Sequence, residues 1–129
     1  MMAARLTGAV TRAAEVTSKA DLVAYAAARK YGKETGGIVV DGMAVATDDR
    51  SKMMLLGARV AAQNDAEFST AWKMADGTWQ TVSAAAIIAI SDAVLAHVDG
   101  CFQTEKSVDA AIEAGTVTTT AEIDALFAA

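Results

Sequence analysis

The chain has 129 residues, which fits one domain, and 53% of them are apolar, which is enough for a hydrophobic core and excludes disorder throughout. Its net charge of −5 argues against the basic surface with which proteins bind nucleic acid, so we expect no nucleic-acid partner. The only cysteine is Cys101, which excludes an intrachain disulfide, and the absence of a stretch of about 18 apolar residues predicts no membrane span.

The N-terminal segment is predicted to be an arm over residues 1–17, followed by a single α+β domain over residues 18–129. The arm carries Arg5 and Arg12 among small residues and lacks the continuous apolar segment of a secretory signal. It has too little apolar bulk to pack firmly alone, so we expect it to become ordered upon assembly.

The first predicted helix begins at a capping box formed by Ser18 and Asp21. The Ser18 hydroxyl can accept a hydrogen bond from a free backbone N–H of the first turn, and the carboxylate of Asp21 suits the helix dipole. Gly36-Gly37 is expected to end this helix.

A β-hairpin is predicted for the segment that follows, with Asp41-Gly42 as its two-residue loop. Asp-Gly between β-forming residues favours a type I′ turn, in which both central residues have positive φ. With this loop, Val40 lies opposite Met43 and Ile38 lies opposite Val45, and these four residues share one face, the expected core face.

A second helix is predicted to begin at Thr47-Asp48-Asp49, whose short polar side chains can cap the first turn, and to close at Asn64-Asp65. Its expected apolar stripe consists of Met53, Leu56 and Val60, widened by Met54 and Leu55.

A second hairpin is predicted over Phe68–Val82, around Asp76-Gly77. A two-residue loop there places Met74 opposite Trp79 and Trp72 opposite Thr81. Both tryptophans and Met74 would then share one face, which we expect to be part of the core because aromatic burial dominates small cores.

The longest helix is predicted to start at Ser83 and to run to Gln103. Its apolar side is expected to comprise Ile87, Ile90, Val94, Val98, Cys101 and Phe102. A last capping box, Thr119 to Glu122, precedes a short helix with Ile123, Leu126 and Phe127.

The element order predicts an α+β fold: helix, β-hairpin, helix, β-hairpin, long helix and short C-terminal helix. A two-stranded ribbon is marginally stable alone, so we expect both hairpins to join one small antiparallel sheet packed on helices, chiefly the Ser83–Gln103 helix.

The candidate chemical groups have simpler structural interpretations. His97 and Cys101 lie four residues apart on one helix face, a spacing that could hold a metal or activate a thiolate. A closed zinc site needs two more ligands, and the chain has no other Cys or His, so we expect packing instead.

Two further patterns are weak signals for chemistry. Asp48 and Asp49 could form an acid–base pair, but helix capping already explains them. The glycines of Gly32–Gly37 precede a strand, whereas a phosphate-binding loop follows one. We therefore predict no catalytic, cofactor-binding or metal site and expect no enzyme activity.

Several segments of the chain together resemble a known protein family: Tyr25–Tyr31, Glu34–Met43, Ala46–Lys52, Trp72–Trp79 and Ile88–Phe102. The family is a domain of unknown function in phage and prophage proteins, usually encoded near tail-fibre and tail-assembly genes. The similarity in order and spacing runs from about Leu22 to Ile112. This resemblance implies a protein that is made in the bacterial cytoplasm and that can be incorporated into the virion tail. It implies no catalytic residue.

The leading hypothesis is therefore a phage structural or tail-assembly protein that acts through protein–protein contacts, either with itself or with a phage structural protein. A second hypothesis is a small phage inhibitor of a host defence or host enzyme. A third is a receptor- or glycan-binding module that presents Trp72 and Trp79 outward.

Overall fold

The computed structural model describes residues 17–128, which divide into two compact units. The hairpin unit comprises residues 30–103, and the terminal unit comprises residues 17–29 together with residues 104–128. Apart from Thr17, the N-terminal arm predicted over residues 1–17 lies outside the described residues.

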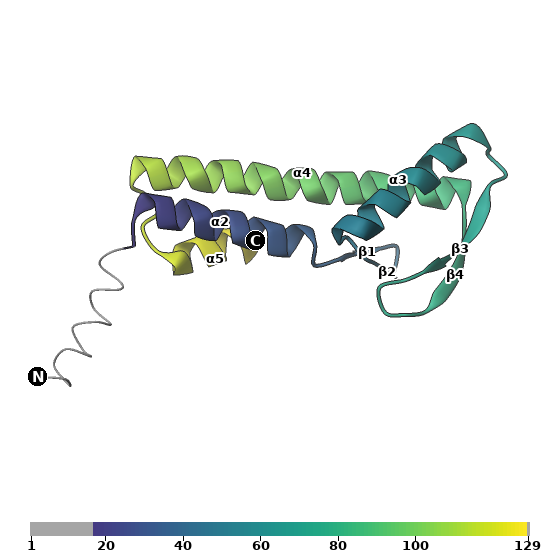
Figure 1. Cartoon of the computed structure of the whole chain (residues 1–129), viewed down its shortest axis with the longest axis horizontal. Coiled ribbons are helices and arrows are strands. Elements are labelled where there is room, and N and C mark those ends of the chain that lie inside the picture. The colour runs from purple at the N-terminus through teal and green to yellow at the C-terminus, as the bar shows by residue number, and fades with distance from the viewer. Residues whose placement is uncertain (1–16, 129) are drawn as a thin grey trace, which may run out of the picture. The chain divides into compact units, whose positions relative to one another are not determined.

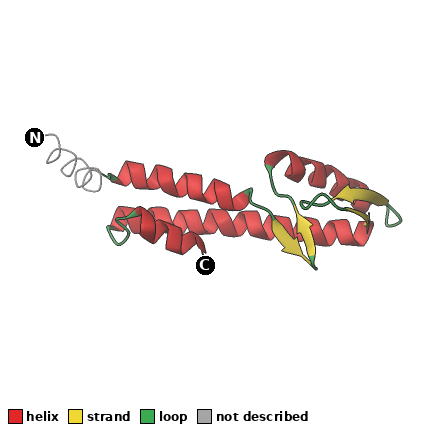
Figure 2. Cartoon of the chain, turned by 90° about the horizontal axis from the view of Figure 1, so that it is seen from below, coloured by secondary structure: helices red, strands yellow, loops and turns green. Residues whose placement is uncertain are grey.

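The described elements follow the predicted order and confirm the α+β class (Figures 1 and 2). They are α2 (Lys19–Glu34), β1 (Ile38–Val40), β2 (Met43–Val45), α3 (Asp49–Asn64), β3 (Ser69–Lys73), β4 (Trp79–Ser83), α4 (Ala84–Ala114) and α5 (Thr120–Ala128). Helices α2 and α4 each contribute residues to both units.

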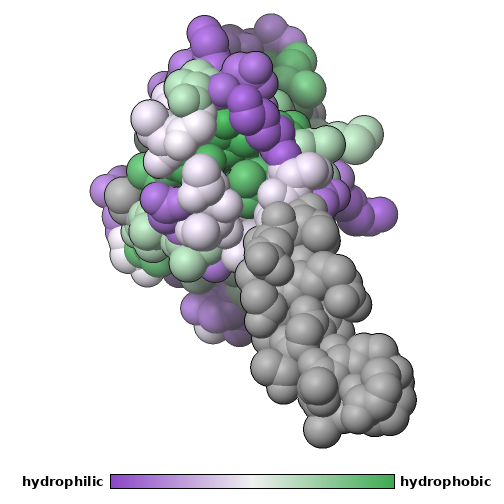
Figure 3. Space-filling view, turned by 90° about the vertical axis from the view of Figure 1, so that its left-hand side faces the viewer, coloured by the Kyte–Doolittle hydropathy of each residue, from purple (hydrophilic) through white to green (hydrophobic). Residues whose placement is uncertain are grey.

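The terminal unit has a small hydrophobic core contributed by α2, α4, α5 and the loop before α5. Its buried members are Leu22, Ala26, Val108, Ile112, Val117, Ile123 and Phe127. The Tyr25 hydroxyl and the Arg29 guanidinium both donate to one carboxylate oxygen of Asp124, at 2.7 and 2.8 Å. Figure 3 looks onto this end of the chain, where the described surface mixes hydrophobic and hydrophilic residues.

Both predicted capping boxes form. Ser18 Oγ accepts from the backbone N–H of Asp21 at 3.0 Å, and an Asp21 carboxylate oxygen accepts from the N–H of Ser18 at 3.3 Å. At α5, Thr119 and Glu122 exchange the same pair of bonds, at 3.2 and 3.1 Å. The backbone N–H of Thr118, followed by the Thr119 hydroxyl, holds the pKa of Glu122 below its usual value.

The hairpin unit has a larger core, shared by both hairpins, α3 and α4. Its buried members are Val45, Leu55, Ala62, Met74, Val82, Ala84, Ile87, Ile90 and Val94. The expected packing of the hairpins on α4 is thus confirmed.

The first hairpin has the predicted register and turn. Ile38 pairs with Val45 and Val40 with Met43, in an antiparallel ladder. Asp41 and Gly42 have φ of 49° and 79°, so both central residues lie in the left-handed region that a type I′ turn requires.

The predicted register of the second hairpin is wrong by one residue. Trp72 pairs with Gln80, and Trp79 pairs with Lys73. The N–H of Gly77 donates to the Met74 carbonyl at 2.9 Å, and the N–H of Met74 donates to the Thr78 carbonyl at 2.7 Å. These bonds close a three-residue loop with Gly77 at positive φ, the alternative to a two-residue turn for a sequence of this kind.

The register shift separates the two tryptophans, because adjacent strand residues point to opposite faces. Trp72 shares a face with the buried Met74 and Val82 and packs against the core. Trp79 lies on the other face and is 66% exposed. The expectation that both indoles share one core face is therefore corrected.

The two hairpins form two separate two-stranded sheets, which corrects the expectation of one joint sheet. One backbone hydrogen bond links them, from the N–H of Ala75 to the carbonyl of Ala44 at 2.9 Å. Because β1 and β2 have only three residues each and Ala75 lies beyond the end of β3, no ladder extends from this single bond.

Helix α3 begins where predicted, with Asp48 as the N-cap accepting from the N–H of Ser51, but it buries a different face. The buried stripe consists of Leu55, which was expected only to widen the apolar stripe, together with Ala62 and the partly buried Ala58. The predicted central stripe of Met53, Leu56 and Val60 is exposed. With 3.6 residues per turn, these two stripes lie on nearly opposite sides of the helix. Alanine allows close helix contact, so the face with smaller side chains was the one buried.

Helix α4 begins as predicted, with Ser83 Oγ accepting from the N–H of Ala86 at 3.1 Å, but it runs past Gln103 to Ala114. It ends at Gly115, whose φ is +80°, and the N–H of Thr116 donates back to the Ala111 carbonyl at 3.0 Å. By length and composition alone this helix could cross a membrane, a test that core helices of globular proteins also pass.

Candidate functional site

The Cys–His pair on α4 lies in the hairpin unit and is engaged in packing. His97 Nε2–H donates to the Lys33 carbonyl oxygen at 2.9 Å, and the Cys101 sulfur lies 4.0 Å from the same nitrogen. Cys101 is buried, and this burial raises the pKa of its thiol. Within residues 17–128 no group of three or more His, Cys, Asp or Glu side chains could hold a metal ion.

The two aspartates before α3 have different roles. Asp48 caps the helix, and its bonds from the Ser51 hydroxyl and backbone hold its pKa below the usual value. Asp49 accepts a 2.7 Å hydrogen bond from the Tyr31 hydroxyl, and its other oxygen lies 3.3 Å from the ammonium of Lys52. The Tyr31 hydroxyl and then Lys52 lower the pKa of Asp49.

A nearly buried carboxylate, Glu34, lies at the end of α2 between two lysines. Lys30 contacts one of its oxygens at 3.0 Å, and Lys52 from α3 binds the other. The bond from Lys52 is the largest cause that lowers the pKa of Glu34, and burial opposes it. For Lys52, burial alone would lower the pKa, but the bonds to Glu34 and Asp49 outweigh it and raise the pKa.

The glycine-rich stretch ends α2 and turns the chain into β1. Gly37 has a φ of +89°, and its N–H donates to the hydroxyl of the fully buried Thr47 at 2.8 Å. This backbone N–H is therefore already bonded within the fold and does not contribute to an anion-binding loop.

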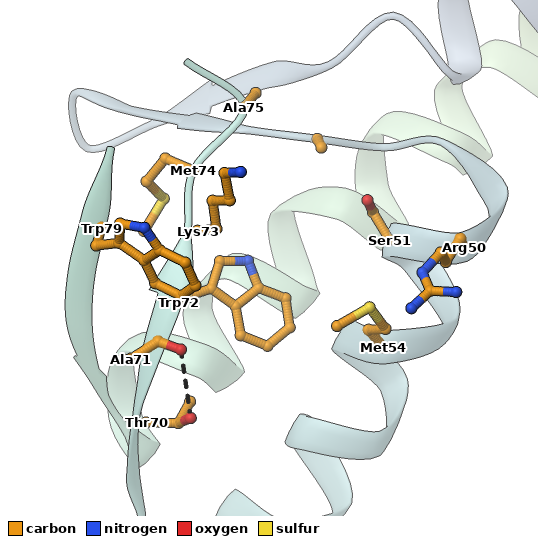
Figure 4. A pocket seen from close by; sticks show the side chains of 11 residues that line it. Arg50, Ser51, Met54, Thr70, Ala71, Trp72, Lys73, Met74, Ala75 and Trp79 are labelled. Atoms are coloured by element: carbon orange, nitrogen blue, oxygen red, sulfur yellow. Dashed lines mark hydrogen bonds between the residues drawn. The ribbon is translucent and has the colours of Figure 1, made fainter. Parts of the chain in front are cut away.

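A cavity of about 560 Å³, which we name the tryptophan cavity, lies between the N-terminal half of α3 and the second hairpin. Its lining residues are Ala46, Arg50, Ser51, Met54, Thr70, Ala71, Trp72, Lys73, Met74, Ala75 and Trp79. Figure 4 shows the indole of Trp72 pointing across this cavity toward Met54 and Arg50 of α3. This volume is in the range of small-molecule and peptide side-chain sites.

The charges that line this cavity are positive. Arg50 and Lys73 are exposed and form no ion pair with any residue in the described range 17–128. The other lining side chains are apolar or neutral, and the Ser51 hydroxyl donates to Asp48 at 2.5 Å. Apolar walls with free cations suit an anionic ligand that also offers an apolar group.

A second surface hollow, of about 390 Å³, lies between α3 and α4. We name it the α3–α4 surface, and its lining residues are Lys52, Leu55, Leu56, Arg59, Ser91, Val94, Leu95 and Val98. Leu56 and Leu95 are both more than 60% exposed, and Met53 and Val60 continue the exposed stripe along α3. Large exposed apolar surfaces of this kind typically mark interaction sites.

The functional features that the sequence reasoning missed depend on contacts between distant segments. The Lys30–Glu34 pair has the four-residue helical spacing that could have revealed it, but the second partner, Lys52, is 18 residues from Glu34. Arg50 lines the tryptophan cavity together with residues of the second hairpin, which lie about twenty positions or more further along the chain.

The comparisons with known proteins identify a family without a known function. No curated protein and no solved structure matches the chain. A family model described as a domain of unknown function, DUF4376, matches residues 17–127, which is most of the chain. The chain therefore belongs to the DUF4376 family of domains of unknown function.

Proposed function

We propose that this chain is a non-catalytic docking protein of a tailed phage or prophage that associates with a second copy of itself through the α3–α4 surface. The phage setting rests on the resemblance to proteins encoded near tail genes. A role in tail structure or assembly requires protein contacts and no chemistry, and the groups that could supply chemistry, Cys101 and His97, are engaged in packing.

The observation that carries the proposal is the exposed apolar stripe of α3 beside Leu95 of α4. Met53, Leu56 and Val60 are half or more exposed, although each is a large apolar side chain. Burying one such side chain is worth about 1.5–3 kcal/mol, so a contact that covers several of them can offset the cost of association.

The charges beside this surface are already neutralised, which favours burial. Arg59 donates to Asp92 at 2.6 Å and to the Ser91 hydroxyl at 3.0 Å. A partner that covers the surface would therefore leave no unpaired charge behind. A second copy of the chain presents the same apolar surface, and a two-fold contact would bury both together.

The oligomeric state tests the proposal directly. Light scattering across a concentration series should show a dimer for the wild-type protein and a monomer for the double variant Leu56→Gln, Leu95→Gln. The matched control is Leu126→Gln, which changes an exposed leucine of α5 in the terminal unit and should leave the dimer intact.

A wild-type protein that stays monomeric at high concentration would overturn self-association. Mass spectrometry of purified virions tests the phage setting separately. Absence from virions and from assembling particles, together with capture of a host defence complex or host enzyme, would favour the inhibitor hypothesis instead.

A further inference from the structure

The tryptophan cavity follows the unpaired edge of β3. Six consecutive residues, Thr70 to Ala75, line it. Side chains of adjacent strand residues point to opposite faces, so one cavity can touch all six only along the edge of the strand. Among the strands of residues 17–128, β3 pairs only with β4, so within this range no strand lies along its other edge.

The hydrogen-bond pattern identifies the backbone groups on this edge. Met74 is bonded to Thr78 across the hairpin, so the alternation of an antiparallel ladder directs the groups of Trp72 and Thr70 toward β4 as well. The N–H and carbonyl groups of Ala71 and Lys73 therefore point away from β4. The next residue on this side, Ala75, uses its N–H to bond the Ala44 carbonyl, which agrees with that direction.

These outward groups are available to a further strand. Within residues 17–128 no backbone bond joins Ala71 or Lys73 to a segment other than β4, and the Ala71 carbonyl has only a long 3.5 Å contact from the Thr70 hydroxyl. An edge strand with unpaired donors and acceptors is a template on which another extended chain can pair.

We infer that this edge binds an extended acidic peptide segment of a partner protein, which adds to β3 as a third strand. Main-chain bonds to Ala71 and Lys73 would supply affinity, and alternate side chains of the bound segment would fall on the Trp72 side and on the Trp79 side. A carboxylate of the segment would pair with Arg50 or Lys73, the two cations without an ion-pair partner among the described residues.

Charge complementarity favours an acidic peptide over the chain's own N-terminal segment as the third strand. Residues 1–16 carry Arg5 and Arg12 against the single acid Glu15, so they would place like charges beside Arg50 and Lys73. The inference concerns a different surface from the proposed self-association, and the double variant Leu56→Gln, Leu95→Gln should bind the same peptides as the wild type.

The test is an array of hexapeptides in which each position carries Val, Phe, Thr, Asp or Lys. Bound sequences should be rich in Asp and in alternating apolar residues. The best of them, measured by fluorescence anisotropy, should lose affinity by at least about tenfold when two backbone nitrogens are methylated, because methylation removes the main-chain donors.

Two protein variants and one control variant complete the test. Arg50→Glu should weaken binding of the acidic peptide at least about tenfold, whereas Lys106→Glu, the same charge change at an exposed site on α4, should not. Ala71→Pro removes one outward N–H and no bond to β4, and proline is tolerated on edge strands, so this variant should fold and lose binding. If it fails to fold, the methylated peptide still tests the backbone bonds.

Several outcomes would overturn the inference: no peptide bound, Lys-rich sequences bound, or binding unaffected by backbone methylation. Binding of a galacturonate trimer at Trp79 with no peptide binding would assign the cavity to an acidic glycan instead, the third hypothesis raised by the sequence.

Discussion

The hydroxyl of Thr47 donates a 2.6 Å hydrogen bond to the carbonyl oxygen of Glu34, and this bond is fully buried. The same hydroxyl accepts from the N–H of Gly37. Thr47→Val keeps the shape but leaves the buried carbonyl of Glu34 and the partly buried N–H of Gly37 without this partner, so it should lower the free energy of unfolding by about 1–3 kcal/mol. Urea denaturation measures this loss. Thr47→Ser keeps the hydroxyl and should cost clearly less, and equal losses would contradict the assigned role of the bond.

Glu34 should make stability depend on pH in the acidic range. Its pKa is lowered below the usual 4.5 in the folded protein, so its contribution is complete above pH 4.5 and is lost as the pH falls through the folded value. Glu34→Gln should be less stable than the wild type at pH 7, because Lys30 and Lys52 lose their shared carboxylate.

The difference between the two proteins should shrink as the pH falls below 4.5. Urea midpoints at pH 7, 4 and 3 measure it. Glu113→Gln is the control, because the Glu113 carboxylate forms an exposed 4.0 Å pair with Lys19, and the hydrogen bond from Lys19 to the Glu113 backbone carbonyl is kept in the variant, so its change should matter little at any pH. A constant difference between wild type and Glu34→Gln across this range would rule out the linkage.

Substitution of Gly42 and of Gly57 should change the free energy of unfolding in opposite directions. A Cβ at Gly42 would meet no atom within 4 Å, but the residue has a φ of +79°, so Gly42→Val should cost at least about 1–2 kcal/mol through backbone strain alone. Gly57 lies inside α3 with open space around it, so Gly57→Ala should raise the free energy of unfolding by about 0.5–1 kcal/mol. Thermal unfolding of both variants checks the signs, and an unchanged midpoint for Gly42→Val would contradict the turn.

The Cys–His pair should be dispensable for metal content and partner binding. We expect His97→Gln combined with Cys101→Ala to leave both unchanged. Because burial raises the pKa of the Cys101 thiol, iodoacetamide should alkylate it slowly in the native protein and rapidly in denaturant. Stoichiometric zinc in the wild type that disappears in the double variant would contradict this interpretation.

The sequence predicts the parts of the fold that depend on local chemistry. Both capping boxes, the N-cap Asp48 and the turn at Asp41-Gly42 form as expected, because each is decided by residues within a few positions. The core face of α3 was mispredicted because the stripe at Met53, Leu56 and Val60 has the same period as the buried one. Periodicity cannot say which of two such faces packs against a neighbour.

The candidate site was harder to predict because tertiary contacts assemble it. The sequence indicates Trp72 and Trp79 as candidate binding residues, but their placement on opposite faces of the hairpin depends on the length of one loop. Arg50 reaches the cavity only because α3 and the second hairpin lie beside each other in the hairpin unit. The carboxylate of Glu34 and the ammonium of Lys52 come from different helices and carry no common sequence signal.

The odd number of residues in the loop between Met74 and Thr78 has a consequence for how this surface can diversify. Loss or gain of one residue there would restore an even count and exchange the two faces of β4 relative to β3. The exposed indole of Trp79 would then lie on the face of Trp72 and Met74, and its neighbour Gln80 would move to the opposite face, without any substitution in either strand. Whether the loop has an odd or an even number of residues thus decides which side chains this hairpin exposes. Relatives whose loop is one residue shorter or longer should therefore expose different side chains even where their strand sequences are nearly identical.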